Sequence, residues 1–138
     1  MRLFIDTNIM LDLLGERLPF YDSIAKIATL SDKGEFNLIV SSLSYSTVFY
    51  LLSKYESKDS VMEKLRKFKI ISEIACVDEI IIEKDLNSTF TDFEDSIQYF
   101  CALKSECDVL ITRNQKDFKE STIPVFSADE YLKSIRKK

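Results

Sequence analysis

The sequence predicts an α/β fold with three layers, α/β/α, around a central and mostly parallel sheet of about five strands. Short apolar segments alternate with longer segments of helical period along the whole chain. Some apolar segments are continuous, as in Leu38-Ile39-Val40, which suits parallel strands covered on both faces. The 138 residues are 46% hydrophobic with only two glycines and two prolines, which favours a single domain over residues 1–138.

The first part of the chain alternates strand and helix. The expected strands, taken from the short apolar runs, are residues 2–5, 36–40, 70–77, 109–112 and 124–126. A helix after Pro19 carries Ile24, Ile27 and Ala28 at spacings of three and four, and Lys33-Gly34 supplies its end. A second helix, over residues 43–55, has apolar side chains on more than one face, so it is either buried on two sides or offers a groove to a partner.

The remaining helices each start at a residue whose side chain can cap the first turn. The expected caps are Asp59, Asp78, either Thr91 with Glu94 or Asp92 with Asp95, and Ser127 with Glu130, the last helix ending at Ile135.

Composition limits the chemistry, because the chain has no histidine and no tryptophan. Catalytic Ser-His and Cys-His pairs and histidine-ligated zinc are therefore excluded. Cys76, Cys101 and Cys107 are odd in number and lack metal-type spacing, so we expect buried free thiols in a reducing cytosol. No segment resembles a signal peptide or a membrane span, which predicts a cytoplasmic protein without a membrane partner.

The formal net charge of −4 is not typical of a free-standing nucleic-acid binder, because lysine and arginine usually supply affinity for phosphates. Basic residues gather at residues 64–69 and 136–138. These clusters are either solvated surface or a groove for a phosphate backbone, and bound metal ions would change the local sign.

Polar residues follow two of the expected strands. Asp6-Thr7-Asn8 ends the first strand and Thr112-Arg113-Asn114 ends the fourth. The carboxyl ends of parallel strands open onto one crevice, where such sheets bind ligands, so we expect a site there. The alternative for these residues is a helix cap after the first strand and a simple turn after the fourth.

A third polar segment, Thr91-Asp92-Phe93-Glu94-Asp95, has three carboxylates in four positions. A capping box needs fewer, and excess like charge is tolerated mainly when a cation neutralises it. On helical spacing Asp95 shares a face with Gln98, Tyr99 and Ala102, so Asp95 can point into the crevice. Carboxylate oxygens are ligands that suit Mg²⁺ or Mn²⁺.

Together these segments resemble the PIN-domain family, in particular the VapC-like toxin ribonucleases of bacterial toxin–antitoxin pairs. The resemblance spans essentially the whole chain. Phe4-Ile5-Asp6-Thr7-Asn8, Asp92-Phe93-Glu94-Asp95 at the start of a helix, and Thr112-Arg113-Asn114 followed by Asp117-Phe118 carry it. It implies a compact α/β domain whose acidic cluster binds Mg²⁺ or Mn²⁺ and cuts RNA, with a small antitoxin protein as a partner. A homodimer is the alternative use of any apolar surface left by the helix after Pro19 and the helix over residues 43–55.

Position by position, the resemblance implies that Asp6 and Asp95 are metal ligands and that Asp92 is an additional one. The fourth acidic position falls on either Asn114 or Asp117, and the sequence leaves this choice open.

One departure from the family pattern concerns the helix after the second strand, where the family usually has a glutamate. Residues 41–47 contain no carboxylate, and Thr47 takes the usual glutamate position. A hydroxyl does not replace the missing negative charge, so we expect Thr47, together with Asn8 and Thr112, to orient water or phosphate.

The leading hypothesis is therefore a Mg²⁺- or Mn²⁺-dependent endoribonuclease, the toxin of a toxin–antitoxin pair, that hydrolyses RNA phosphodiesters through a metal-activated water. The alternative is a catalytically weak or inactive PIN-like module that binds RNA or a protein partner, which the missing glutamate and the acidic net charge favour. An aspartyl-phosphate phosphatase is less consistent, because Asn8 stands where such enzymes place a second aspartate.

Overall fold

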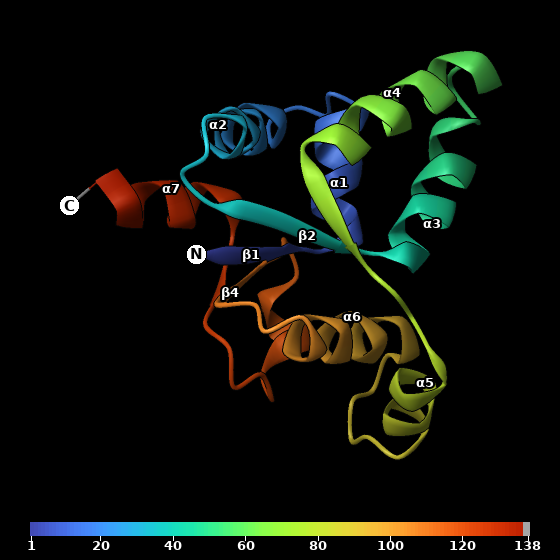
Figure 1. Ribbon diagram of the computed structural model, residues 1–138, viewed down its shortest axis with the longest axis vertical. Coiled ribbons are helices and arrows are strands. Elements are labelled where there is room, and N and C mark those ends of the chain that lie inside the picture. The colour runs from blue at the N-terminus through green and yellow to red at the C-terminus, as the bar shows by residue number, and fades with distance from the viewer. Residues whose placement is uncertain (137–138) are drawn as a thin grey trace.

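The computed structural model describes residues 1–136; Lys137 and Lys138, the end of the second basic cluster, lie outside the described residues. Five strands form one sheet in the order β3-β2-β1-β4-β5, and every neighbouring pair is parallel. The strands are β1 (Arg2–Ile5), β2 (Asn37–Ser41), β3 (Ser72–Ala75), β4 (Val109–Ile111) and β5 (Val125–Phe126). The predicted parallel α/β sheet is confirmed (Figure 1).

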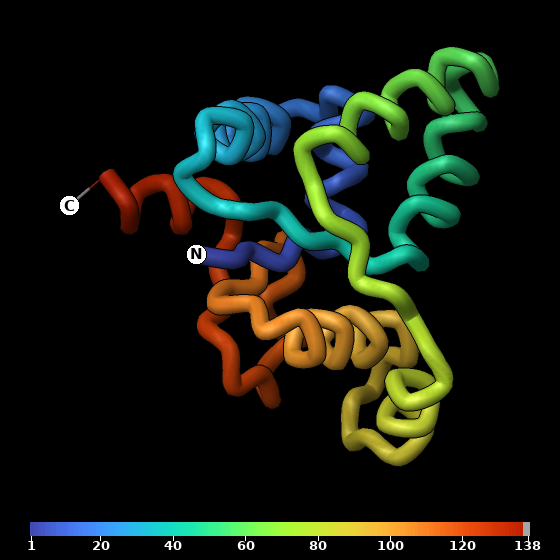
Figure 2. The backbone as a smooth tube through the Cα atoms, viewed as in Figure 1, coloured from blue at the N-terminus to red at the C-terminus, as the bar shows by residue number. Residues whose placement is uncertain are grey.

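Helices cover both faces of this sheet, which gives the predicted three layers. They are α1 (Thr7–Leu14), α2 (Tyr21–Asp32), α3 (Ser42–Leu52), α4 (Lys58–Ile70), α5 (Glu79–Leu86), α6 (Phe93–Lys104) and α7 (Ala128–Arg136), with a 3₁₀ helix, η1, at Gln115–Phe118. In Figures 1 and 2, α1 to α4 lie above the sheet and α5 and α6 lie below it, while α7 packs beside α2.

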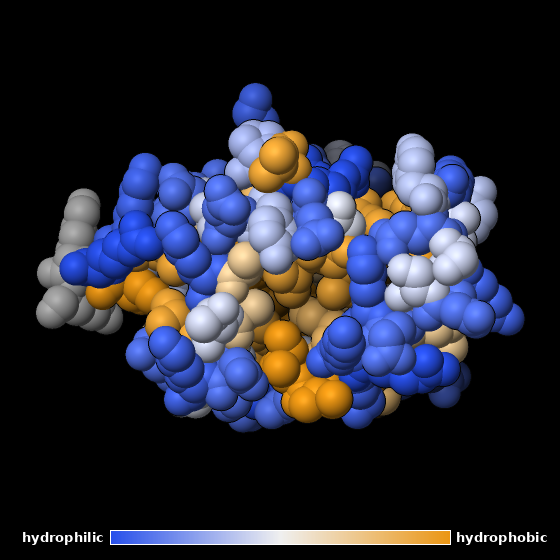
Figure 3. All heavy atoms as spheres, turned by 90° about the horizontal axis from the view of Figure 1, so that it is seen from above, coloured by the Kyte–Doolittle hydropathy of each residue, from blue (hydrophilic) through white to orange (hydrophobic). Residues whose placement is uncertain are grey.

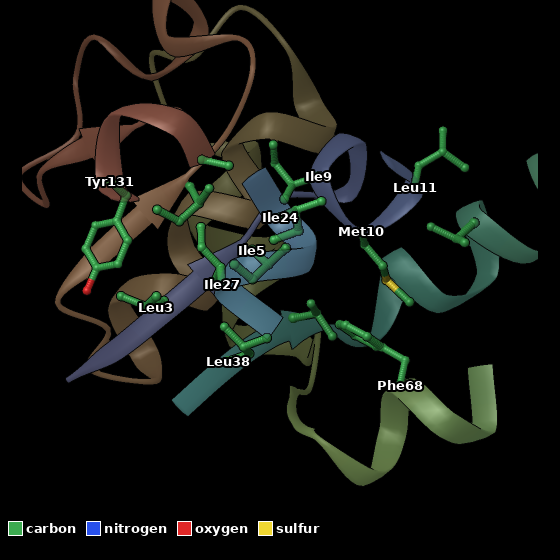
Figure 4. Close-up of a cluster of buried hydrophobic side chains, with 14 of the residues drawn as sticks. Leu3, Ile5, Ile9, Met10, Leu11, Ile24, Ile27, Leu38, Phe68 and Tyr131 are labelled. Atoms are coloured by element: carbon green, nitrogen blue, oxygen red, sulfur yellow. The ribbon is translucent and has the colours of Figure 1, made fainter. Parts of the chain in front are cut away.

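The alternation of side chains along the strands produces two hydrophobic cores. Leu3 and Ile5 point to the face covered by α1, α2 and α4, where Ile24 and Ile27 lie beside them in a cluster that extends to Phe68 (Figure 4). Phe4, Ile39 and Leu110 point to the opposite face and pack against α5 and α6, with Ile81, Ile97 and Phe118. Because both faces are covered, the three central strands have continuous apolar runs, residues 3–5 in β1, 38–40 in β2 and 109–111 in β4.

Some predicted boundaries were wrong. Residues 70 and 71 do not belong to β3, because α4 continues to Ile70 and its C-cap is Ile71. The N-cap of α4 is Ser57, whose hydroxyl accepts a hydrogen bond from the backbone N–H of Ser60 at 3.2 Å; Asp59 is inside the helix. Helix α1 was not among the expected elements, because its eight residues follow β1 directly, with no turn between strand and helix.

Helix α3 resolves the two alternatives left open for residues 43–55. It ends at Leu52, and it packs between α1 and α4, with Val48 and Leu52 buried. Its apolar residues on several faces are therefore explained mainly by burial on two sides, although Tyr50 and Tyr55 remain exposed.

The three cysteines are free thiols, as expected, but only Cys101 and Cys107 are buried. Cys76 is exposed because it follows β3, the strand at the edge of the sheet. Burial raises the pKa of both Cys101 and Cys107 to about 12. Over residues 1–136, no helix has the length and apolar character needed to cross a membrane.

Candidate active site

Asp6 occupies the position directly after β1, at the start of α1, and its carboxylate is buried with 5% of the residue exposed. Its Oδ1 accepts hydrogen bonds from the backbone N–H of Thr7 at 2.8 Å and from Nε2 of Gln98 at 3.1 Å. Its Oδ2 accepts a hydrogen bond from the Thr112 hydroxyl at 2.7 Å. Three donors therefore fix the orientation of this carboxylate.

Gln98 of α6 connects Asp6 to a buried group of hydroxyls that sequence reasoning did not identify. Its Nε2 donates to Thr7 Oγ1 at 3.0 Å and to Ser44 Oγ at 3.1 Å, and the Ser41 hydroxyl donates to its Oε1 at 2.5 Å. A carboxylate only accepts hydrogen bonds, so the amide nitrogen must face Asp6, which fixes the orientation of the amide. The network joins the ends of β1 and β2 to α6.

Negative charge is concentrated in the first turn of α6. Asp92 caps this helix by accepting a hydrogen bond from the backbone N–H of Asp95 at 2.9 Å, one of the two capping pairs that the sequence allowed. Burial raises the pKa of Asp95 to about 7, and the charges of Asp6, Asp92, Asp117 and Glu94 add to this effect. The carboxylates of Asp6, after β1, and Asp95, in α6, therefore lie close enough to repel each other although they are far apart in the sequence.

The pKa values of two further carboxylates, Glu94 and Asp6, are also raised. Burial raises the pKa of Glu94, and the charges of Asp92 and then Asp6 raise it further. Burial is also the main cause of the raised pKa of Asp6, where Asp117 is the nearby charge that adds to it. Glu94 was not among the predicted site residues, although its place between Asp92 and Asp95 in the sequence was a signal for it.

The segment after β4 supplies the other predicted site residues. Thr112 is fully buried, and its hydroxyl accepts a hydrogen bond from the backbone N–H of Asn114 at 3.1 Å while it donates to Asp6. The side chain of Asn114 is exposed, and Asp117 is exposed on η1. Asn8 lies at the same edge, where its Oδ1 accepts a hydrogen bond from the backbone N–H of Arg113 at 3.4 Å.

Thr47 lies half-buried on α3. From its segment, within the part of the chain that the structure describes, the hydroxyls that hydrogen-bond to the network around Asp6 belong to Ser41 and Ser44. Ser41 is the last residue of β2 and Ser44 lies in the first turn of α3, so both are nearer to the carboxyl end of the strand than Thr47 is.

The donor atoms of this centre fit a hard divalent cation in their chemistry, because they are carboxylate oxygens. Burial raises the pKa of Asp95 and the nearby like charges raise it further, and a bound cation would relieve this penalty on the ionised form. Over residues 1–136, no three acidic or thiol side chains converge closely enough to enclose an ion by themselves. Water would therefore complete the ligand shell, as is usual for Mg²⁺.

The comparison with known proteins agrees with this geometry. Residues 2–116 match the family model of the PIN domain. The chain belongs to the PIN-domain family. This confirms the resemblance drawn from the polar segments around Asp6, Asp95 and Thr112.

Several PIN-domain relatives extend over nearly the whole chain. Ribonuclease VapC1 of Aquifex aeolicus (strain VF5) is 27% identical over 135 residues, which cover 94% of this chain and 92% of the relative. The VapBC2 structure from Rickettsia felis, bound to a DNA fragment from its promoter, has a TM-score of 0.69 at 20% identity and covers 92% of this chain and 98% of that chain. The VapBC-1 structure from nontypeable Haemophilus influenzae also has a TM-score of 0.69, at 18% identity, and covers 94% of this chain and 99% of that chain. These structures confirm the fold.

Proposed function

We propose that this PIN-domain protein is a metal-dependent endoribonuclease and the toxin of a toxin–antitoxin pair. The observation that carries the proposal is the buried Asp6 carboxylate, held by three donors and placed among the carboxylates of α6 and η1 at the carboxyl edge of the sheet. The relative from Aquifex aeolicus, which is named a ribonuclease, supports the same activity.

Asp6 and Asp95 are the residues that would hold Mg²⁺ or Mn²⁺, with Asp92 as an additional ligand. When bound, such an ion supplies positive charge for the phosphodiester and activates a water for hydrolysis. Thr112, Gln98 and the Thr7 N–H hold Asp6 in a fixed orientation, so its carboxylate needs little reorganisation. Asn8 lies beside it, where it would orient water or phosphate.

For the fourth acidic position we favour Asp117 over Asn114, because the Asp117 charge acts on both Asp6 and Asp95. Glu94 supplies a further carboxylate, whose pKa is raised by burial and then by the charges of Asp92 and Asp6. Glu94 and Asp117 together would compensate for the carboxylate that Thr47 does not provide.

The surface also supports an antitoxin partner. A groove between α1, α2 and α4 has an apolar floor that includes Leu13, Leu14 and Phe68, and Lys64 and Lys67 lie at its edge. Figure 3 shows apolar side chains between hydrophilic ones on the face above the sheet. An amphipathic segment of a small antitoxin would bury this surface, as in helix-in-groove recognition, and a second copy of the chain is the alternative occupant.

The experiment that tests the proposed activity compares wild type with Asp6→Asn and Asp95→Asn on a labelled single-stranded RNA in Mn²⁺. We expect both variants to lose cleavage by on the order of 100-fold or more, because each removes a charge that holds the ion. Circular dichroism checks that they fold. Asp59→Asn is the matched control, because Asp59 is an exposed acid on α4, and it should cleave like wild type.

Cleavage by purified Asp6→Asn or Asp95→Asn at the wild-type rate would refute the assignment. Titration with Mn²⁺, followed by calorimetry, separates the enzyme from the module that binds RNA without cutting it. Folded wild type that binds no Mn²⁺ at millimolar concentration and cuts no RNA would favour the non-enzymatic module.

A further inference from the structure

Arg113 stands directly after Thr112, and its side chain is fixed by two other elements. Its Nε donates to Oδ2 of Asp12, a fully buried residue of α1, at 2.8 Å. Its guanidinium carbon lies 4.4 Å from the centre of the Phe20 ring, in a cation–π contact. The guanidinium is thus fixed against α1 and the segment before α2, while the backbone of Arg113 directly follows Thr112, the residue that donates to Asp6.

The contact with Asp12 leaves most of the guanidinium donors without a protein partner. A guanidinium has five N–H donors in a planar fork, and a structural pair with a carboxylate is often bidentate. Here the hydrogen bond to Asp12 uses Nε alone, and Oδ1 of Asp12 has no hydrogen-bond partner within residues 1–136. The side chain of Arg113 is 30% exposed and lines an open pocket, so part of it is accessible to a ligand.

The surroundings of the guanidinium suit an anion that is part of a larger molecule. Arg113 lines an open pocket whose apolar wall is Ile9, Pro19 and Phe20 and whose hydroxyls come from Ser23 and Ser127. Asp129 also lines this pocket, and its carboxylate is paired with Lys133 at 2.9 Å. The guanidinium therefore presents positive charge at a wall that is otherwise apolar or neutralised.

A positive charge on the path of an RNA strand would offset the negative charge of the acidic centre. The chain has a net charge of −4, and the charges of Asp6, Asp92, Glu94 and Asp117 already act on Asp95. An RNA strand that approaches these carboxylates needs at least one cation beside them to receive its backbone. Arg113 is one residue from Thr112, which contacts Asp6, and its planar fork matches the oxygens of a phosphate.

We propose that Arg113 binds a backbone phosphate of single-stranded RNA next to the acidic centre, with Asp12 and Phe20 holding the guanidinium in position. The choice of RNA as the ligand rests on the proposed function. The binding step itself requires neither a metal ion nor cleavage, so it is measured separately from the nuclease activity.

The test measures the affinity of the full chain for a fluorescein-labelled single-stranded RNA by anisotropy, in EDTA, over a series of KCl concentrations. For single strands, the slope of log K against log salt concentration changes by about 0.7 for each phosphate contact. Arg113→Gln is expected to make the slope shallower by about 0.7 and to weaken binding severalfold at the lowest salt. Arg113→Lys, which keeps the charge, should retain the slope.

Arg66→Gln is the matched control, because it removes the same charge from an exposed arginine of α4. Arg66 pairs with Glu63 at 3.4 Å. Removal of the Asp12 partner leaves a buried charge, so Arg113→Gln can lose stability. If circular dichroism shows that it does not fold, the double variant Asp12→Asn/Arg113→Gln, which removes both charges, replaces it in the same comparison.

A slope for Arg113→Gln or the double variant equal to that of Arg66→Gln would overturn the proposal, as would wild type that does not bind RNA in EDTA. The outcome is distinct from a failure of the proposed function. RNA that binds with an Arg113-dependent slope but is never cut in Mn²⁺ would refute the nuclease and leave the phosphate contact standing.

Discussion

The hydrogen-bond network around Gln98 gives a sharp test of how the site is held together. Gln98 is fully buried, and Gln98→Leu replaces its amide by an apolar side chain of similar size. The substitution removes the donor to Asp6 Oδ1 and the acceptor for the Ser41 hydroxyl. It leaves a carboxylate oxygen and a hydroxyl buried with fewer partners.

The expected loss follows from these contacts. A hydrogen bond to a charged group contributes about 1.5–3 kcal/mol and a neutral one about 0.5–1.5 kcal/mol. Thr7 and Ser44 remain hydrogen-bonded to each other at 2.7 Å, so we count only the bonds to Asp6 and Ser41 as fully lost. We therefore expect the free energy of unfolding to fall by about 2–4 kcal/mol. For a chain of this length, that corresponds to a melting temperature lower by about 10 °C.

Urea unfolding followed by circular dichroism measures this loss directly. The matched control is Gln115→Leu, because Gln115 is exposed on η1 and its Nε2 donates to the Val125 carbonyl at the long distance of 3.3 Å. It should change the free energy of unfolding by less than about 0.5 kcal/mol. A loss below about 1 kcal/mol for Gln98→Leu, with an unchanged m-value, would show that the network does not hold Asp6 in place.

Two further predictions concern ionisable groups. Because the folded-state pKa of Asp95 is raised to about 7 from 3.8, the folded protein binds an extra proton between these values, and stability should decline as the pH rises through this window. The melting temperature in EDTA should therefore fall between pH 5 and pH 8, with a shallower fall in Asp95→Asn and a smaller one in Mn²⁺; a flat wild-type profile would contradict the raised pKa of Asp95. For the thiols, a disulfide reagent at pH 8 should modify Cys76 rapidly, and Cys101 and Cys107 only after denaturation, because these two are buried with a pKa of about 12. Rapid reaction of all three in the native protein would be inconsistent with the observed burial.

Most of the fold could be predicted from sequence because both cores depend on local patterns. Continuous apolar runs such as Leu38-Ile39-Val40 mark strands that are covered on both faces, and the observed sheet has them at its centre. The apolar pattern is weaker in β3, which lies at the edge of the sheet. Ile74 of β3 is exposed, so apolar character alone did not show where α4 ends and β3 begins.

The residues of the site also differ in how well sequence predicts them, for the same reason. Asp6 and Asp95 stand where a strand ends and a helix begins, and such ends are visible in sequence as a change from apolar to polar residues. The partners of Asp6 are not visible in this way, because Gln98 and Ser44 come from other elements and meet Asp6 only through the packing of α6 and α3 on the sheet. The contact of Arg113 with Asp12 is likewise a long-range pair.

The way Asp6 is held also explains why the neighbouring acids are tolerated. Burial alone would favour a neutral carboxyl at Asp6, and the donors Thr112, Gln98 and Thr7 act against this by favouring the ionised form. Within residues 1–136 no such set of donors acts on Asp95, so burial, and then the nearby charges, raise its pKa to about 7. The ionised forms of Asp6 and Asp95 are both penalised by burial and by nearby like charges, which leaves a requirement for positive charge between them. Under the proposals made above, a divalent cation would meet this requirement at Asp6 and Asp95, and the guanidinium of Arg113 would meet it for the substrate backbone.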